Sequence, residues 1–280
     1  MNLAVPIIAG TAIRGVAATL MMNRVLERHP RAFLVTLAQF GVTIPLHRSQ
    51  EHLEADIRRG LEERKFDPDT PLVIVGHSQG GLAALRYAAD HPDRVRHAIS
   101  IGAPWHGARS ATNVARFVPR RFTPAVYDMA EGSRFLSELH ADLPAVADRV
   151  TNIYSTHEIL IRPYVAAHID VPGVRNILVG SDEEHRRHLD MYPHHEVDDV
   201  VLGSVNHFSE MNSPKVRSRI WAQVEATERD LAADAGSSPT SGESSAPSQD
   251  LLPPPPRTSA EDGVGAQRRG SLRIVAPGAD

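Results

Sequence analysis

Cysteine is absent from this chain of 280 residues. That absence excludes disulfide bonds, thiolate metal sites and a cysteine nucleophile, so we expect any covalent catalysis to depend on a serine. Aromatic residues are also few, at 5% of the chain. Long apolar runs are missing too, since no stretch reaches the roughly 18 to 20 residues that span a bilayer. The sequence therefore predicts no integral membrane segment.

Neither sign of charge is in large excess, since the formal net charge is only -4. A chain without a basic excess is not expected to bind nucleic acid. The apolar N-terminal segment has its first basic residue at Arg14 and so lacks the positive start of a secretory signal peptide. We therefore favour a cytoplasmic protein, and the sequence does not indicate its oligomeric state.

Short apolar segments alternate with amphipathic ones along most of the chain. We expect strands over 3–9, 32–37, 72–75, 95–101, 150–154 and 176–179, and helices over 16–26, 52–65 and 214–231. Such alternation predicts an α/β fold, with a mostly parallel sheet covered by helices on both faces. We assign this domain to residues 1–234.

Two segments break the alternation. Residues 108–148 are helical in places, interrupted by prolines and comparatively rich in aromatic residues, and we interpret them as a lid or cap insertion; a plain surface excursion is the alternative. Residues 235–280 are rich in Ser, Pro and Gly, which predicts a disordered tail. Its LLPPPP stretch is read as a passive extension, although a polyproline segment could meet an SH3-like partner.

The segment PLVIVGHSQGGLAALRYAADHP, 71–92, predicts a strand, a sharp turn and a helix, with Ser78 at the turn. Gly76, Ser78 and Gly80 form a GxSxG pattern, in which the glycines let strand and helix approach closely around an exposed serine. We interpret Ser78 as a nucleophile, against the alternative of an ordinary glycine-rich turn. The N–H of Gln79 would then point from a helix N-terminus toward a developing oxyanion.

A serine nucleophile needs a base and an acid, in the chain order serine, acid, histidine. His207 lies in the turn-rich loop before the last expected helix and is our candidate base. Glu158 follows the strand expected over 150–154 and is our first candidate acid, with Asp182 after the next strand as the alternative. For the second oxyanion donor we expect the N–H of Thr11, with Ala12 as its competitor.

The chain resembles a bacterial lipase or esterase of the α/β-hydrolase fold. Four segments carry the resemblance in the family's order: GHSQGG at 76–81, GAPWHG at 102–107, YSTHEILIRP at 154–163 and VNHFSEMN at 205–212. They are similar to the nucleophile elbow, the segment after the next strand, the acid loop and the histidine loop, and together they cover about residues 3–230. The resemblance thus implies Ser78, Glu158 and His207 as the catalytic residues.

This chain departs from the family's pattern at three places. It has Ala9 before Gly10 where the family's oxyanion loop begins His-Gly, and it has Ser209 where many relatives have a calcium-binding aspartate. It also begins almost at the first strand of the alternating core, which suggests a trimmed sheet. A calcium site of the family's kind is therefore not expected.

The predicted function is hydrolysis of carboxylic esters, as a triacylglycerol lipase or carboxylesterase acting on a small-molecule or lipid ester. Phe117, Phe122 and Tyr127 of the expected lid are assigned to an apolar acyl pocket. Two alternatives stay open: an acyltransferase that uses the same acyl-enzyme, and a non-catalytic binding protein.

No cofactor and no required metal are expected. The cluster over 181–199 contains residues that could form a zinc-like set, but we interpret it as a solvated charged loop. The residues in question are His185, His188, His194, His195, Glu196 and Asp199.

Overall fold

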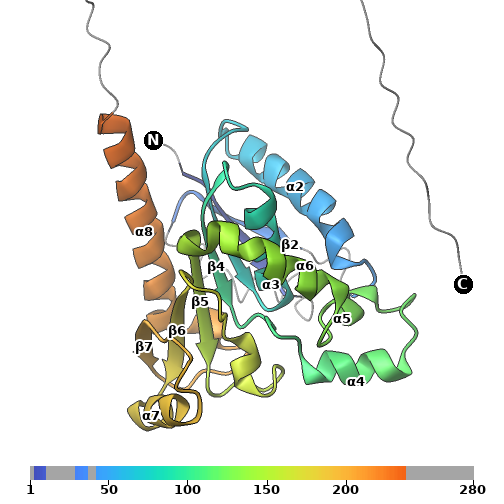
Figure 1. Cartoon of the computed structure of the whole chain (residues 1–280). Coiled ribbons are helices and arrows are strands. Elements are labelled where there is room, and N and C mark those ends of the chain that lie inside the picture. Colours follow the sequence, from blue (N-terminus) through green and yellow to red (C-terminus); the bar gives the residue numbers. More distant parts are fainter. Residues whose placement is uncertain (1–2, 11–28, 37–41, 238–280) are drawn as a thin grey trace, which may run out of the picture. The chain divides into compact units, whose positions relative to one another are not determined.

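A computed structural model describes residues 3–10, 29–36 and 42–237, which belong to one compact unit. These residues form a seven-stranded, all-parallel sheet in the order β2-β1-β3-β4-β5-β6-β7 (Figure 1). The strands are β1 Val5–Ala9, β2 Ala32–Thr36, β3 Leu72–His77, β4 Val95–Ile101, β5 Val150–Ser155, β6 Arg175–Gly180 and β7 Asp199–Leu202. The helices are α2 Leu46–Glu63, α3 Gln79–Asp90, α4 Arg109–Phe117, α5 Pro124–Asp128, α6 Arg134–Asp142, α7 Asp182–Met191 and α8 Pro214–Ser237, with 3-10 turns η2 Leu143–Arg149, η3 Tyr164–Ala167 and η4 Glu210–Asn212.

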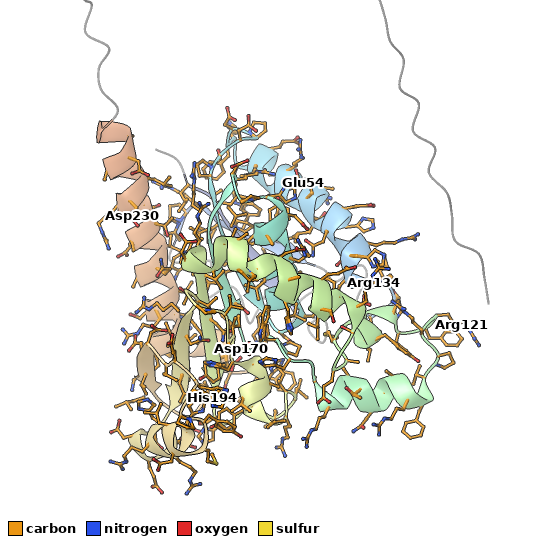
Figure 2. The ribbon with its side chains drawn as sticks, viewed as in Figure 1. Glu54, Arg121, Arg134, Asp170, His194 and Asp230 are labelled. Atoms are coloured by element: carbon orange, nitrogen blue, oxygen red, sulfur yellow. The ribbon has the colours of Figure 1, made fainter. Side chains whose placement is uncertain are left out.

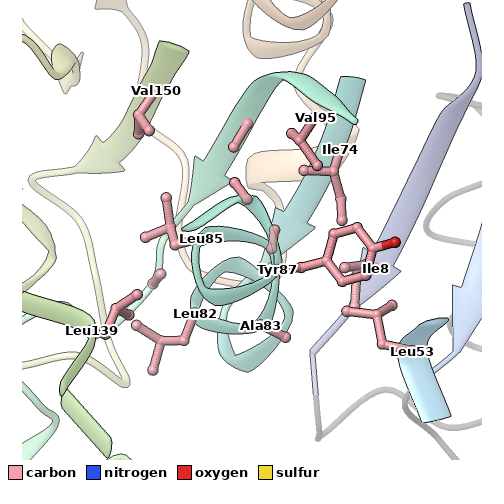
Figure 3. Packing of buried hydrophobic residues seen from close by; sticks show 14 of the residues in the cluster. Ile8, Leu53, Ile74, Leu82, Ala83, Leu85, Tyr87, Val95, Leu139 and Val150 are labelled. Carbon is pink, nitrogen blue, oxygen red and sulfur yellow. The ribbon is translucent and has the colours of Figure 1, made fainter. Parts of the chain in front are cut away.

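One face of the sheet packs on α2, α3, α6 and η2. Ile8 and Ile74 of the central strands meet Leu82, Leu85 and Tyr87 of α3 in one buried cluster, part of which Figure 3 shows. Leu53 of α2 and Leu139 of α6 close the sides of this cluster. Alternate residues of a strand point to opposite faces, so the neighbours of Ile74 in β3 serve the other side of the sheet.

The other face packs on α8. Val73 and Val75 of β3 lie in a second buried cluster with Ile220 and Val224 of that helix. Because both faces are covered, the central strands are continuous apolar runs, as is typical of buried parallel sheets. Figure 1 shows α8 separate from the group formed by α2, α3 and α6.

The sequence prediction of a parallel α/β sheet is confirmed, with strand ends within about two residues of those expected. The helix expected over 52–65 instead begins at Leu46. Its first turn is held because the N–H of Leu46 donates to Asp128 Oδ2 at 2.7 Å and Leu46 itself is buried. That contact joins residues 82 apart in the sequence, so the local pattern could not reveal it.

The expectation of a solvated loop over 181–199 is wrong. Residues 182–191 form α7, because Ser181 and Glu184 make a capping box at its start. Residues 199–202 form β7, which pairs with β6 at the sheet edge. The helix expected over 16–26 lies outside the described residues, as does most of the tail expected over 235–280, whose first three residues continue α8.

The insertion expected over 108–148 divides into two parts. The later part is integral to the core, since Leu139 of α6 and Leu143 and Val146 of η2 are buried in the cluster that includes α3. The earlier part forms α4 and α5, which we call the cap, and Ala125 of α5 also lies in that cluster. In the described part of the chain, none of the helices has the length and apolar character needed to cross a membrane.

Candidate active site

Ser78 lies at a strained turn between β3 and α3. Its φ is 57° and its ψ is -126°, a region that a residue with a side chain rarely occupies. Its N–H donates to the carbonyl oxygen of Ile101 at 2.8 Å, and its own carbonyl accepts from the N–H of Gly81 at 2.9 Å. The turn therefore holds the Ser78 side chain above the end of the sheet.

The glycines of this turn are required by close packing. A Cβ on Gly76 would overlap the backbone of Gly80, and a Cβ on Gly80 would lie 2.5 Å from the carbonyl oxygen of Ile8. Gly10 also lies close, since its Cβ would be 2.8 Å from that of Ser78. The loop after β1 therefore begins directly beside the serine.

We predict that Gly76→Ala destabilises the fold by about 3 kcal/mol or more, because backbone atoms cannot move aside as a flexible side chain can. Gly203→Ala is the matched control, since a Cβ there would meet nothing within 4 Å. Urea unfolding of both variants measures the two effects. Equal stability of the two variants would contradict this interpretation of the turn.

Ser78 and two side chains from distant loops form a row of contacts. His207 Nε2 lies 2.9 Å from Ser78 Oγ, and His207 Nδ1 lies 2.9 Å from Glu158 Oε2. His207 precedes η4, and Glu158 follows β5, so both loops leave the same edge of the sheet as the serine turn. A hydroxyl, an imidazole and a carboxylate aligned in this way can pass a proton from the hydroxyl to the ring.

Hydrogen bonds and the neighbouring His207 favour the carboxylate form of Glu158. Burial alone would raise its pKa, but the hydrogen bond and charge of His207 and the N–H groups of Leu160 and Ile161 outweigh burial, so the pKa is lowered. Glu158 Oε1 accepts the N–H groups of Ile159 and Leu160, each at 2.8 Å. The other oxygen is thus left for His207 and can stabilise an imidazolium.

A protein family described as "alpha/beta hydrolase fold" matches residues 44–160, which contain the serine turn and the Glu158 loop. The chain has the α/β-hydrolase fold. The parallel sheet described above agrees with that assignment, as does the place of Ser78 at the end of a central strand. Of the four segments that carry the resemblance, those at 76–81 and 102–107 lie inside the matched residues, the one at 154–163 overlaps their end, and the one at 205–212 lies beyond them.

Several known proteins are similar to this hydrolase-fold chain over part of their length. A 1-acylglycerol-3-phosphate O-acyltransferase of Arabidopsis thaliana is 38% identical over 64 residues, which are 22% of this chain and 15% of that protein. The solved structure of Aspergillus fumigatus lipase B is 18% identical, with a TM-score of 0.43, over 58% of this chain and 39% of that one. The peroxisomal alpha-beta-hydrolase Lpx1 of Saccharomyces cerevisiae is 12% identical, with a TM-score of 0.47, over 89% and 81%. The chain spans well under half the length of the first two.

The expected oxyanion donors of this hydrolase fold are only partly described. Gln79 is the first residue of α3, so its N–H belongs to the first turn of that helix, immediately after Ser78. Thr11 and its competitor Ala12 lie outside the described residues. Gly10, the last described residue of that loop, is beside Ser78 as the expected donor position requires.

An apolar cavity of about 370 Å³ opens above Ser78 and His207. Its other lining residues come from the cap, the Glu158 loop and two connections: Val42, Pro104, Ala108, Ser110, Ala111, Val114, Val126, Met129, Leu160 and Ile161. These lining residues were not predicted from the sequence. The spacing of Ala111 and Val114 on one face of α4 is the signal that would have pointed to them.

The expected pocket residues Phe117, Phe122 and Tyr127 do not line this cavity, so their assignment needs correction. Phe117 and Phe122 are exposed at the end of α4 and in the loop after it. The Tyr127 hydroxyl donates to the carbonyl oxygens of Ala115 and Val118, so this ring joins the two cap helices. Aromatic content alone does not tell which side of a short helix faces the cavity.

The alternative acid Asp182 is exposed in the first turn of α7, and it lines a different surface hollow from the one above Ser78. The hydrogen-bond partner of His207 Nδ1 is Glu158. The geometry therefore favours Glu158 over Asp182.

His77 and Glu210 form a buried pair next to His207. His77 Nε2 donates to the backbone carbonyl of His207 at 2.8 Å and lies 3.5 Å from Glu210 Oε2. Burial lowers the pKa of His77 to about 4 and raises that of Glu210 well above its ordinary value, so burial favours the neutral form of both side chains. Gly102, at φ 53°, leaves room for the Glu210 carboxyl group, which a Cβ there would overlap. The sequence motifs assigned no role to either residue of this pair.

Candidate metal ligands gather at one place in the described part of the chain. Atoms of His77, His207 and Glu210 lie within 4.8 Å of one another, and all three residues are buried. Both ring nitrogens of His207 already contact Ser78 and Glu158, so an ion held there would compete with those contacts. The zinc-like set considered over 181–199 is not gathered in this way.

Two histidines of that segment, His188 and His195, instead pack with tyrosines. His188 is buried, with its ring nitrogens 3.4 Å from the hydroxyl of Tyr154 and 2.9 Å from that of Tyr164. The rings of His168 and His195 stack with centroids 4.0 Å apart. This cluster has no contact with the cavity above Ser78 that would assign it a part in catalysis.

We predict that the fold loses stability as the pH falls from about 6.5 to 4. Burial lowers the pKa of four histidines from 6.5 to between about 3 and about 4: His77, His97, His168 and His188. The unfolded chain therefore binds protons in this range that the folded chain excludes, and each fully titrating histidine costs about 1.4 kcal/mol per pH unit. The raised pKa of Glu210 opposes this by at most one proton, against the four histidines, so the slope keeps its sign.

Urea unfolding at several pH values measures that slope. His168→Gln is expected to flatten it by about one proton, because glutamine does not titrate. A free energy of unfolding that is constant or rises toward pH 4 would contradict the prediction.

Proposed function

We propose that the chain is a serine hydrolase that cleaves carboxylic esters through an acyl-enzyme on Ser78. One observation carries the proposal: Ser78 Oγ, the His207 ring and the Glu158 carboxylate are joined by two contacts of 2.9 Å at the floor of an apolar cavity. The strained backbone of Ser78 supports it further, because such strain is typical of functional turns.

In the first half-reaction Ser78 Oγ attacks the ester carbonyl carbon while His207 Nε2 takes the hydroxyl proton. The carbonyl oxygen becomes an oxyanion, which the N–H groups of Gln79 and Thr11 would stabilise. The bond to the alcohol oxygen then breaks. His207 Nε2 gives its proton to that oxygen, the alcohol leaves, and the acyl group remains on Ser78.

In the second half-reaction water attacks the acyl carbon and His207 Nε2 takes a proton from it. The bond to Ser78 Oγ breaks, the proton returns to Ser78, and the carboxylic acid leaves. Glu158 keeps the His207 ring oriented through Nδ1 and stabilises its charged form in both halves. No step requires a group other than these residues, the ester and water.

The cavity wall supports a substrate with an apolar acyl chain. Its lining is mostly aliphatic, and its volume of about 370 Å³ is near the lower end of the range of about 300 to 1,000 Å³ for small-molecule sites. One acyl chain fits this description better than a whole triacylglycerol. Hydrolysis of p-nitrophenyl esters of increasing chain length tests the proposal and sets the length.

We predict that Ala111→Phe moves the preferred ester toward shorter chains, because the new ring would occupy the cavity that Ala111 lines. The expected change in kcat/KM for the longest accepted chain is about tenfold or more, since each lost methylene contact is worth on the order of 1 kcal/mol. Phe117→Ala is the control and should leave the profile unchanged. A shift in the Phe117 variant alone would restore the pocket that the sequence analysis assigned.

Acyl transfer to an alcohol other than water is the second candidate, because the similar Arabidopsis thaliana protein is named as an acyltransferase. The first half-reaction would be the same, and the acceptor hydroxyl would replace water in the second. Product analysis with added glycerol separates the two: free acid alone supports hydrolysis, and a predominant glyceride supports transfer.

A further inference from the structure

The end of α4 exposes two large aromatic side chains that no part of the site explains. Phe117 is 86% exposed and Phe122 is 56% exposed. Both lie within residues 116–122, which comprise the end of α4 and most of its connection to α5 and which we call the cap tip. Single exposed apolar residues are ordinary, but two exposed phenylalanines within six residues are an apolar feature that needs an explanation.

The cap tip is also basic. The segment 109–127 contains Arg109, Arg116, Arg120 and Arg121 and no acidic residue, within a chain whose net charge is -4. Arg120 pairs with Asp128 at 3.3 Å and Arg109 lies 3.9 Å from Glu131.

Two of these arginines are left for an external partner. Among the described residues, no carboxylate lies within 4.0 Å of Arg116 or Arg121. The Arg121 guanidinium lies 4.5 Å from the centre of the Phe122 ring, so charge and apolar surface occur at the same spot. Figure 2 shows Arg121 at the outer edge of this unit, on the connection between α4 and α5.

Exposed apolar side chains continue from the cap tip to the mouth of the cavity. Val114 and Leu160 both line the cavity and are 41% and 37% exposed. Ser110 Oγ donates to the carbonyl oxygen of Leu160 at 3.0 Å, which joins the start of α4 to the Glu158 loop. Phe208, next to His207, is also exposed. A partner on the cap tip would therefore lie beside the entrance to Ser78.

We propose that the cap tip docks on an anionic lipid surface. Phe117 and Phe122 would enter the boundary between headgroups and acyl chains, and Arg116 and Arg121 would bind lipid phosphates. Aromatic rings gain from leaving water at that depth, and each arginine gains from the negative surface potential. Charge complementarity favours this occupant, because an anionic lipid surface offers phosphates to Arg116 and Arg121 and an apolar interior to the two phenylalanines beside them. The docking does not depend on the proposed ester hydrolysis.

Vesicle cosedimentation of the full chain tests this proposal, with Ser78→Ala as the background so that no lipid is consumed. Vesicles of phosphatidylcholine alone are compared with vesicles that also contain phosphatidylglycerol. The protein is expected to bind the second kind and to be released by salt. Arg116→Gln with Arg121→Gln should weaken binding by about fivefold per arginine. Phe117→Ser with Phe122→Ser should weaken it by at least tenfold.

Matched controls come from α7, where Arg186→Gln with Arg187→Gln removes the same charge and Leu189→Ser with Met191→Ser removes exposed apolar side chains. Both control pairs should bind as the background does. Hydrolysis of a soluble short-chain ester, measured with Ser78 restored, should be the same in the cap-tip variants as in the unaltered chain. Because that ester is dissolved in water, its hydrolysis tests the catalytic residues separately from the docking on lipid.

Three results would overturn the proposal: no binding to anionic vesicles, equal loss in the α7 controls, or a dimer in solution that Phe117→Ser with Phe122→Ser separates. The last would assign the cap tip to a second copy of the chain.

Discussion

Replacement of Ser78 by alanine is expected to lower kcat for ester hydrolysis by on the order of 10⁴-fold or more. The reason is geometric, because within the described residues Ser78 Oγ is the nucleophilic atom that His207 Nε2 contacts, at 2.9 Å. Alanine removes that oxygen and leaves the cavity and the Glu158–His207 contact in place. The fold should be retained, since the hydrogen bonds that hold the turn use the backbone of Ser78.

Ser110→Ala is the matched control for that measurement. Ser110 lines the same cavity, but its hydroxyl donates to the carbonyl oxygen of Leu160 and has no contact with His207. This variant should retain most of the activity on p-nitrophenyl esters. Full activity of Ser78→Ala would remove Ser78 from the reaction and with it the proposed function.

Replacement of Glu158 by glutamine is expected to lower kcat by on the order of 10³- to 10⁴-fold with little change in KM. A neutral amide cannot stabilise the imidazolium that forms on His207, and its NH₂ group would favour the wrong ring tautomer. The loop should keep its shape, because the glutamine oxygen can still accept the N–H groups of Ile159 and Leu160.

Asp182→Asn provides the comparison that separates the two candidate acids. Asp182 is exposed in the first turn of α7, so this variant should keep its rate within about twofold, as for most surface substitutions. Measurement of kcat for both variants decides between them. A large loss in Asp182→Asn together with an active Glu158→Gln would assign the acid to Asp182.

The fold could be predicted from the sequence where its signals are local. The strand, turn and helix around Ser78 lie within 22 residues, and the steric need for Gly76 and Gly80 arises inside that segment. The strands followed from the apolar runs that both faces of the sheet require. The positions of Glu158 and His207 followed from chain order, because loops at one edge of a parallel sheet converge.

The surroundings of the site could not be predicted in the same way. His77 contacts His207 across 130 residues, and the burial of Glu210 depends on the space left by Gly102. The direction of Phe117 depends on how α4 lies over the strand ends, which its own sequence does not specify. These features arise from contacts between segments far apart in the chain, and no local pattern encodes them.

The most direct test of the account is reaction of the folded protein with a fluorophosphonate, followed by mass spectrometry of the digested chain. The central claim is that His207 and Glu158 activate Ser78 as a nucleophile. We expect one adduct, on the peptide that contains Ser78, and its loss when the protein is unfolded before the reaction or when Glu158 is replaced by glutamine. No adduct on the folded protein, or an adduct on another serine, would contradict the claim and favour a hydrolase-fold protein that binds its ligand without catalysis.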